Sequence, residues 1–253
     1  MDTGNVVIVK DFECRISDFP NTLEEYADIF EDGILDKFFV KDKKVKFTMS
    51  ISLEKNGKKI IAAVDCTGHG VPGAFMSMVG TSLLNEIVNE KNVTTSSEIL
   101  NKLKDRLITT LQQTGAEGES KDGMDIAICC ISNGELEFSG ANNPMYLVRK
   151  SEIVEIKGDK HPIGIHMGRE HHFGSHKMKT EKGDCIYIFS DGYADQFGGP
   201  KEKKFKQRKF IEMLLEYNDI PMHEQENFLR KTIVDWQGAN EQVDDMLVIG
   251  FRI

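Results

Sequence analysis

The sequence lacks the features of membrane-spanning and exported proteins. No apolar run approaches the ~20 residues that a transmembrane helix needs. The first residues, MDTGNVVIVKDFE, have neither the basic start nor the long apolar core of a signal peptide. Positive charge is also scarce, because 32 Lys and Arg residues stand against 41 Asp and Glu residues, a formal net charge of −9. We therefore expect no membrane span and no nucleic-acid surface, whereas excess acid fits a cation site or simple solubility.

The cysteines lack the pairing that a disulfide framework or a zinc site would show. There are five, an odd number, and none has CxxC spacing. Four of them lie in or beside apolar stretches, so we interpret them as reduced, small hydrophobic residues and expect a cytoplasmic protein. The histidines between residues 161 and 176 likewise fit no tetrahedral zinc pattern.

Repeats and low-complexity linkers are absent as well. A chain of 253 residues forms one large domain or two small ones. Residues 1–43 are hard to interpret, and we expect an N-terminal extension or cover there. Residues 44–253 are expected to form the folded domain.

The most informative stretch that is present spans residues 60–79, IIAAVDCTGHGVPGAFMSMV. Five apolar residues typical of a buried strand end at Asp65, a turn with Gly68 and Gly70 follows, and Pro72 opens a helical pattern. A carboxylate thus lies beside a glycine turn and a helix N-terminus, a place that suits a metal ion or a phosphate. Taken alone, an Asp here is equally well an ordinary turn residue.

The remaining pattern predicts an α+β layered fold of antiparallel sheets covered by helix pairs. Asn56-Gly57 and Asn133-Gly134 are hairpin signals, and a loop rich in Gly and His is expected up to Lys179. The expected strands are 5–9, 45–53, 60–64, 124–131, 135–139, 145–149, 153–156, 185–190 and 246–253. The expected helices are 73–89, 96–113, 206–217 and 222–236.

Three of these strands adjoin carboxylates in the same way. Residues 60–64 end at Asp65, residues 185–190 end at Asp191, and the last strand follows Asp244-Asp245. Carboxylates that converged would repel one another unless a cation held them. Oxygen ligands without Cys or His favour Mg²⁺ or Mn²⁺.

Six segments together resemble one family. They are DCTGHGVPGAFMS, GMDIAIC, FSGANNPMYLVR, GDKHPIGI, FSDGYADQFGG and QVDDMLVIGF. In this order and spacing, over about residues 50–253, they resemble the SpoIIE-like branch of the PPM/PP2C metal-dependent protein serine/threonine phosphatases. The resemblance implies a four-layer α-β-β-α sandwich with two Mn²⁺ or Mg²⁺ ions at one end, and hydrolysis by a metal-activated water without a covalent intermediate.

The resemblance also implies roles for individual residues. Asp65 is similar to the Asp that bridges both metals, and the carbonyl of Cys66 takes the place of a Gly carbonyl ligand. Asp191 and Asp244 resemble ligands of the second metal, with Asp245 as their neighbour. His69 is either a general acid for the leaving seryl oxygen or a structural residue of the turn. The asparagines of the segment 140–144, GANNP, either cap strand ends or line the cleft.

One departure from the family bears on activity. The family has an acidic residue in a Gly-Asp-Phe-Tyr-like motif on the strand before residues 60–64. Pairing through the Asn56-Gly57 hairpin puts Phe47 and Thr48 there, and neither supplies a carboxylate. Asp36 has somewhat similar neighbours but lies too far upstream unless the hairpin is lengthened. Two functions therefore stay open: an active phosphatase, and a pseudophosphatase that acts as a binding or regulatory module.

The resemblance implies the partners too. The substrate would be a phosphoserine or phosphothreonine protein, often a STAS-type anti-sigma antagonist in bacterial signalling. The helix after the glycine turn is a candidate contact for a homodimer.

Overall fold

A computed structural model of the chain describes residues 6–10, 48–68, 71–116, 122–165 and 171–253. Its strands form two five-stranded antiparallel sheets, with the orders β2-β3-β4-β5-β8 and β1-β12-β9-β6-β7. The first sheet consists of β2 (Thr48–Lys55), β3 (Lys58–Cys66), β4 (Met124–Ser132), β5 (Glu135–Ala141) and β8 (His176–Lys179). The second consists of β1 (Val6–Lys10), β12 (Leu247–Arg252), β9 (Cys185–Phe189), β6 (Met145–Arg149) and β7 (Glu152–Ile156).

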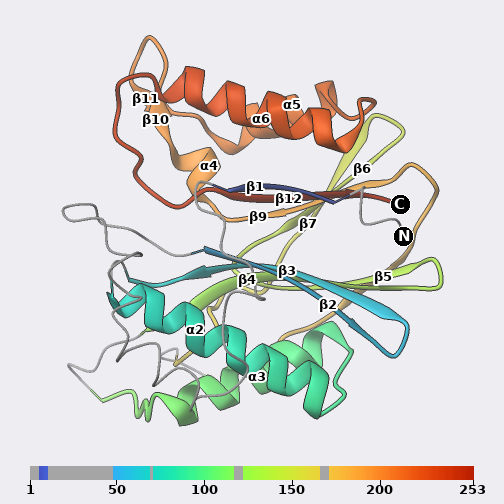
Figure 1. The fold of residues 1–253 in the computed structure, drawn as a ribbon, viewed down its shortest axis with the longest axis vertical. Helices are drawn as coiled ribbons and strands as arrows, with labels where there is room; N and C mark the ends of the chain where they lie inside the picture. The colour runs from blue at the N-terminus through green and yellow to red at the C-terminus, as the bar shows by residue number, and fades with distance from the viewer. Residues whose placement is uncertain (1–5, 11–47, 69–70, 117–121, 166–170) are drawn as a thin grey trace, which may run out of the picture.

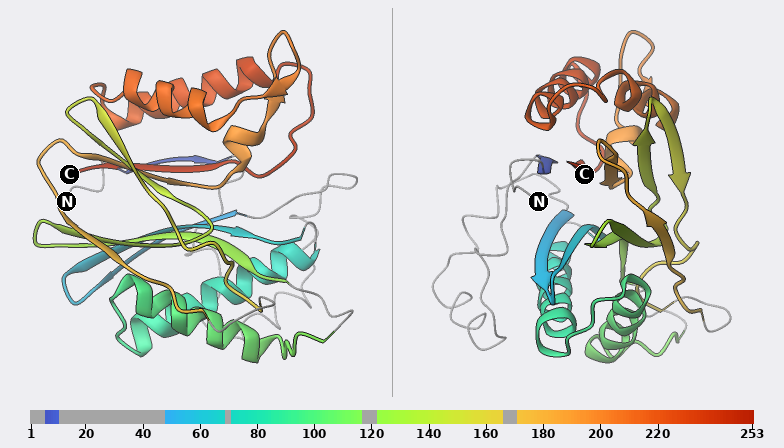
Figure 2. Two further views of the ribbon diagram at one scale, coloured as in Figure 1. Left: turned by 180° about the vertical axis from the view of Figure 1, so that it is seen from behind. Right: turned by 90° about the vertical axis from the view of Figure 1, so that its right-hand side faces the viewer.

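Helices cover the outer face of each sheet, which confirms the predicted four-layer sandwich (Figure 1). The first sheet is covered by α2 (Val71–Asn85), its π-helical continuation η4 (Glu86–Glu90) and α3 (Ser96–Thr110). The second is covered by α5 (Gln207–Glu216) and α6 (Met222–Gln237). The short helix α4 (Gly192–Asp195) and the ribbon of β10 (Phe197–Gly198) and β11 (Lys203–Lys204) precede α5. Figure 2 shows the same layers from behind and from the side.

The apolar core lies in three layers, because successive strand residues point to opposite faces. In β3, Ile60, Ala62 and Val64 pack toward α2 and α3. The alternating residues Ile61 and Ala63 pack against the second sheet. A third cluster joins the second sheet to α5 and α6. The run of apolar residues in β3 is thus explained by burial on both faces.

Most of the predicted elements are present with small shifts at their ends. The loop expected up to Lys179 contains an additional strand, β8, which pairs with β5. The strand expected at residues 5–9 is present as β1, which pairs with β12. The division of the chain at residue 43 stays a prediction. Among the described helices, none is long and apolar enough to span a membrane.

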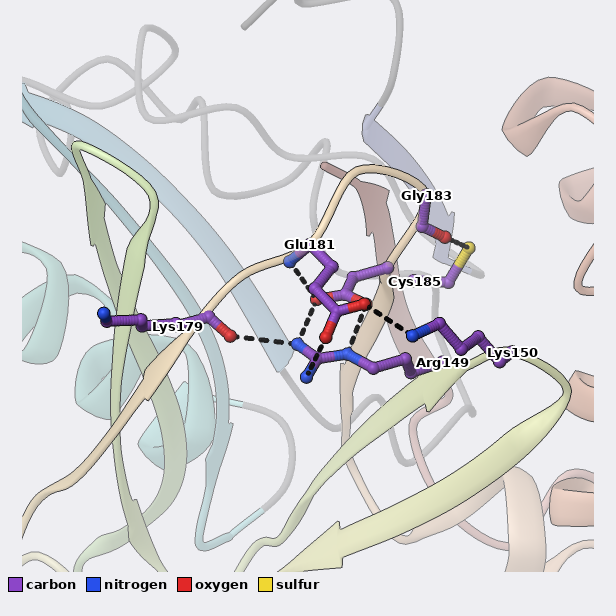
Figure 3. A network of polar contacts seen from close by, with 7 residues as sticks. Arg149, Lys150, Lys179, Glu181, Gly183 and Cys185 are labelled. Atoms are coloured by element: carbon purple, nitrogen blue, oxygen red, sulfur yellow. Dashed lines mark hydrogen bonds and ion pairs between the residues drawn. The ribbon is translucent and has the colours of Figure 1, made fainter.

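Arg149, at the end of β6, links the two sheets (Figure 3). Its guanidinium donates to both carboxylate oxygens of Asp184, at 2.8 and 2.6 Å, and to the backbone carbonyl of Lys179 in β8, at 2.9 Å. Burial alone would raise the pKa of the Asp184 carboxyl, but the hydrogen bonds from Arg149 and the Glu181 amide bring it below its usual value. Because Asp184 precedes β9 and Asp191 follows it, this network lies at the far end of β9 from the acidic residues described next.

Candidate metal centre

Asp65 lies at the end of β3 and faces the second sheet. It has the same parity as Ile61 and Ala63, whose side chains pack between the sheets. In the ladder it is flanked by Thr48 of β2 on one side and by Asp125 of β4 on the other. The hairpin pairing predicted from Asn56-Gly57 is therefore confirmed, and a threonine lies directly opposite Asp65.

The second sheet contributes Asp191 and Asp244 from adjoining loops. Asp191 follows β9 and occupies the N-cap position of α4, and Asp244 lies just before β12. Ser190 joins the two loops, since its hydroxyl donates to the carbonyl of Asp245 at 2.8 Å and accepts from the amide of Leu247 at 3.0 Å. The pairing of β9 with β12 thus brings together two acids that are 53 residues apart in the chain.

The three carboxylates meet at one point. One oxygen from each of Asp65, Asp191 and Asp244 lies within 4.8 Å of the others. Asp65 and Asp244 are half-buried and Asp191 is exposed. No His or Cys belongs to this group as the structure describes it. The cluster therefore offers oxygen ligands alone, open to solvent on one side.

The electrostatics of the cluster are unfavourable without a cation. Burial raises the pKa of the Asp65 carboxyl to about 8, helped by the negative charges of Asp244, Asp191, Asp245 and Asp125 in that order. Carboxylates this close repel one another, and a bound cation reverses that cost. Hard oxygen ligands suit Mg²⁺ and Mn²⁺, so the donor set fits the ions that the sequence predicted.

The structure places the other predicted site residues as follows. Cys66 is buried toward α2 and α3, and burial raises the pKa of its thiol to about 12, so the thiol is no ligand. The role predicted for its carbonyl stays a prediction. The amide of Asp245 donates to Asp244 Oδ1 at 2.9 Å, and the role predicted for the Asp245 side chain stays a prediction. His69 lies outside the described residues.

Sequence reasoning missed one acid beside the cluster. Asp125 pairs with Asp65 across the ladder, and its Oδ1 accepts a hydrogen bond from Asn142 Nδ2 at 2.8 Å. Burial raises the pKa of the Asp125 carboxyl, the bond from Asn142 lowers it, and the charge of Asp191 raises it, with a net increase. The signal was available, because Asp125 lies in the segment GMDIAIC at the start of a strand. Which of the two roles the GANNP asparagines have, capping strand ends or lining the cleft, stays a prediction.

Comparison with known proteins gives one family and one fold. The family model described as "Stage II sporulation protein E (SpoIIE)" matches residues 55–253. No curated protein matches the sequence. The SiaA-PP2C domain of Pseudomonas aeruginosa is similar in structure, with a TM-score of 0.74 and 24% identity over 90% of this chain and 95% of that one.

Two further solved structures have the same fold. One is the PP2C phosphatase domain of SpoIIE from Bacillus subtilis with a fragment of its regulatory domain, at a TM-score of 0.63 and 18% identity. The match covers 81% of this chain and 58% of that one. The other is RsbX in complex with magnesium, at a TM-score of 0.54 and 14% identity over 84% and 90% of the two chains.

Proposed function

The chain belongs to the SpoIIE family of PP2C-type phosphatases, as its motifs predicted, and from this premise we propose that it is an active, metal-dependent protein serine/threonine phosphatase. The proposal includes a cytoplasmic location, which is supported by the free, buried thiols of Cys66, Cys129, Cys130 and Cys185. PP2C phosphatases depend on Mg²⁺ or Mn²⁺, and the donor set described above fits such ions.

One observation carries the proposal: Asp65, Asp191 and Asp244 converge to within 4.8 Å although they come from two different sheets. An accidental surface cluster would not place a half-buried carboxylate on the inner face of a sheet, where burial and then the neighbouring acids raise its pKa to about 8. The arrangement costs free energy in the absence of a cation and is stabilised by one. This is the behaviour expected of a binding site rather than of three turn residues.

In this proposal Asp65 would contribute to both cation sites, and Asp191 and Asp244 would hold the second cation. The carbonyl of Cys66 would contribute to the first site, and Asp245 would help to orient Asp244 through the bond from its amide. Divalent cations bound there would lower the pKa of a water toward ~7 and neutralise charge on the phosphoryl oxygens. For His69 the two expected roles, general acid and turn residue, remain alternatives.

A second function is favoured by a specific observation. Thr48 lies opposite Asp65 on β2, at the position where the family motif would put an acid. A site with a weaker or missing second cation would leave a pseudophosphatase that binds a phosphoprotein without hydrolysing it. Both functions use the same fold, but only the active phosphatase would hydrolyse the bound phosphoprotein.

The active phosphatase and the pseudophosphatase are distinguished by assays of p-nitrophenyl phosphate and phosphoserine peptide hydrolysis in the presence of Mn²⁺. We expect Asp191→Asn to lower kcat by a factor on the order of 100 or more, since several kcal/mol of transition-state stabilisation depend on the metal. Asp105→Asn, on the exposed face of α3, is the matched control and should leave kcat unchanged. An Asp191→Asn protein as active as the wild type would refute the enzyme. A wild type that binds Mn²⁺ without turnover would favour the binding module.

We infer that the substrate is a phosphoserine or phosphothreonine protein, of the STAS anti-sigma antagonist type that is common for this branch of the family. A homodimer through α2 belongs to the same inference. Faster hydrolysis of a phosphorylated STAS protein than of the phosphoserine peptide would support this substrate. A doubled mass in analytical sedimentation would support the homodimer.

A further inference from the structure

The two neighbours of Asp65 in the sheet differ in chemistry. On β2 its partner is Thr48, a neutral hydroxyl. On β4 its partner is Asp125, a carboxylate. Residues directly opposite each other in an antiparallel ladder point to the same face, with Cβ atoms about 4.5–5.5 Å apart. Both neighbours therefore flank Asp65 on the inner side of the first sheet, and the acid lies on the β4 side.

The face on which Asp125 lies follows from the core. The next alternate residues of β4, Ala127 and Cys129, pack between the two sheets. Their neighbours Ile126 and Ile128 pack toward the helices instead. Asp125 thus continues the inward row at its end, as Asp65 does in β3. Like charges directly opposite each other destabilise a sheet, so this pair needs a compensating group.

The Asp125 carboxylate is also held in a fixed orientation. Asn142 Nδ2 donates to its Oδ1 at 2.8 Å. Asn142 itself has a left-handed backbone, with φ of 60°, and its amide donates to the carbonyl of Asp159 at 2.8 Å. The Asp159 amide in turn donates to the carbonyl of Gly140 at 2.8 Å. A backbone network thus fixes the amide that orients the acid, as outer hydrogen bonds commonly do for metal ligands.

We propose that Asp125 is a further ligand of the metal centre and that it takes the place of the acid absent from β2, with Asn142 as its positioning residue. The inference rests on the proposed function, since it needs the cluster of Asp65, Asp191 and Asp244 to hold cations. It explains how the site keeps enough negative charge for two ions although Thr48 contributes none. An acid on either strand beside Asp65 satisfies the same requirement.

The test is Mn²⁺ binding by the full chain, measured by isothermal titration calorimetry and by electron paramagnetic resonance of free Mn²⁺. We expect the wild type to bind two ions. Asn142→Ala should weaken one of them by about tenfold to a hundredfold, and Asp125→Asn should weaken the same ion by at least as much. Thr48→Asp in the Asp125→Asn background should restore the affinity. Asp105→Asn is the matched control and should bind as the wild type does.

Each outcome has a separate meaning. If Asp125→Asn binds both ions with wild-type affinity, the inference is wrong and the proposed function stands. If the wild type binds no Mn²⁺, the proposed function fails and the inference fails with it. If Asp125→Asn weakens one ion and Thr48→Asp does not restore it, Asp125 is a ligand but no replacement for the β2 acid. Asn is isosteric with Asp, and a melting curve without metal verifies that each variant is folded.

Discussion

At the scale of single residues, metal binding at this site depends on the protonation state of Asp65. Its carboxyl is half-buried on the inner side of β3, and burial together with four neighbouring acids raises its pKa from 3.8 to about 8. In the metal-free protein Asp65 therefore keeps its proton at neutral pH. Binding a divalent cation must displace that proton, so affinity for the metal should increase with pH.

The stability of the metal-free protein should depend on pH for the same reason. Between pH 4 and pH 8 the folded chain holds the Asp65 proton and the unfolded chain has lost it. The folded state binds more protons, so the free energy of unfolding is highest below about pH 4 as far as this group is concerned and falls as pH rises toward 8. We expect a loss of the order of a few kcal/mol, measured by urea unfolding in chelator at several pH values.

Asp65→Asn is the control for this prediction, because it removes the titrating group while keeping its size. The variant should show a flatter dependence of stability on pH, and added Mn²⁺ should reverse the slope in the wild type alone. Equal slopes in the two chelated proteins would show that Asp65 titrates normally and that the carboxylates do not interact as described.

At the scale of elements, the position of α4 depends on a glycine. Gly192 begins α4 directly after Asp191, and a Cβ atom there would lie 2.2 Å from the carbonyl oxygen of Asp245. The backbone that carries Asp244 and Asp245 thus packs directly against Gly192. Only a residue without a side chain lets the two loops of the second sheet approach closely enough to bring Asp191 and Asp244 together.

Gly192→Ala should therefore displace the loop that carries Asp244. We expect a loss of about 1–3 kcal/mol in the free energy of unfolding, and Mn²⁺ affinity reduced at least tenfold. Gly174→Ala is the matched control, because a Cβ atom there meets nothing within 4 Å, and it should bind Mn²⁺ normally. Calorimetric titration of both variants is the measurement, and wild-type affinity in Gly192→Ala would contradict this account of the loop.

Much of the site could be predicted from the sequence because strand periodicity determines which face a residue occupies. Asp65, Asp191 and Asp244 each adjoin an apolar strand, and the Asn56-Gly57 hairpin fixed the register that puts Thr48 opposite Asp65. Asp125 was missed because it lies on β4, and two helices separate β4 from β3 in the sequence. Such long-range pairing depends on packing that local patterns do not encode. The strand β8 was missed for the same reason, since β5 supplies its hydrogen bonds.

At the scale of the whole molecule, the contacts between the two sheets differ from one end of the sandwich to the other. At one end the Arg149 guanidinium links the sheets through its hydrogen bonds to Asp184 and to the carbonyl of Lys179. At the other end both sheets present carboxylates to each other. The molecule is therefore joined by its own charges at one end, and at the other end we expect a metal ion to join the sheets.

The most direct test of this account is a crystal of the full chain grown with Mn²⁺, with diffraction recorded at the manganese absorption edge. We expect anomalous peaks between the carboxylates of Asp65, Asp191 and Asp244, in contact with oxygen atoms from both sheets. Manganese found only elsewhere on the molecule, with these three side chains directed away from one another, would contradict it.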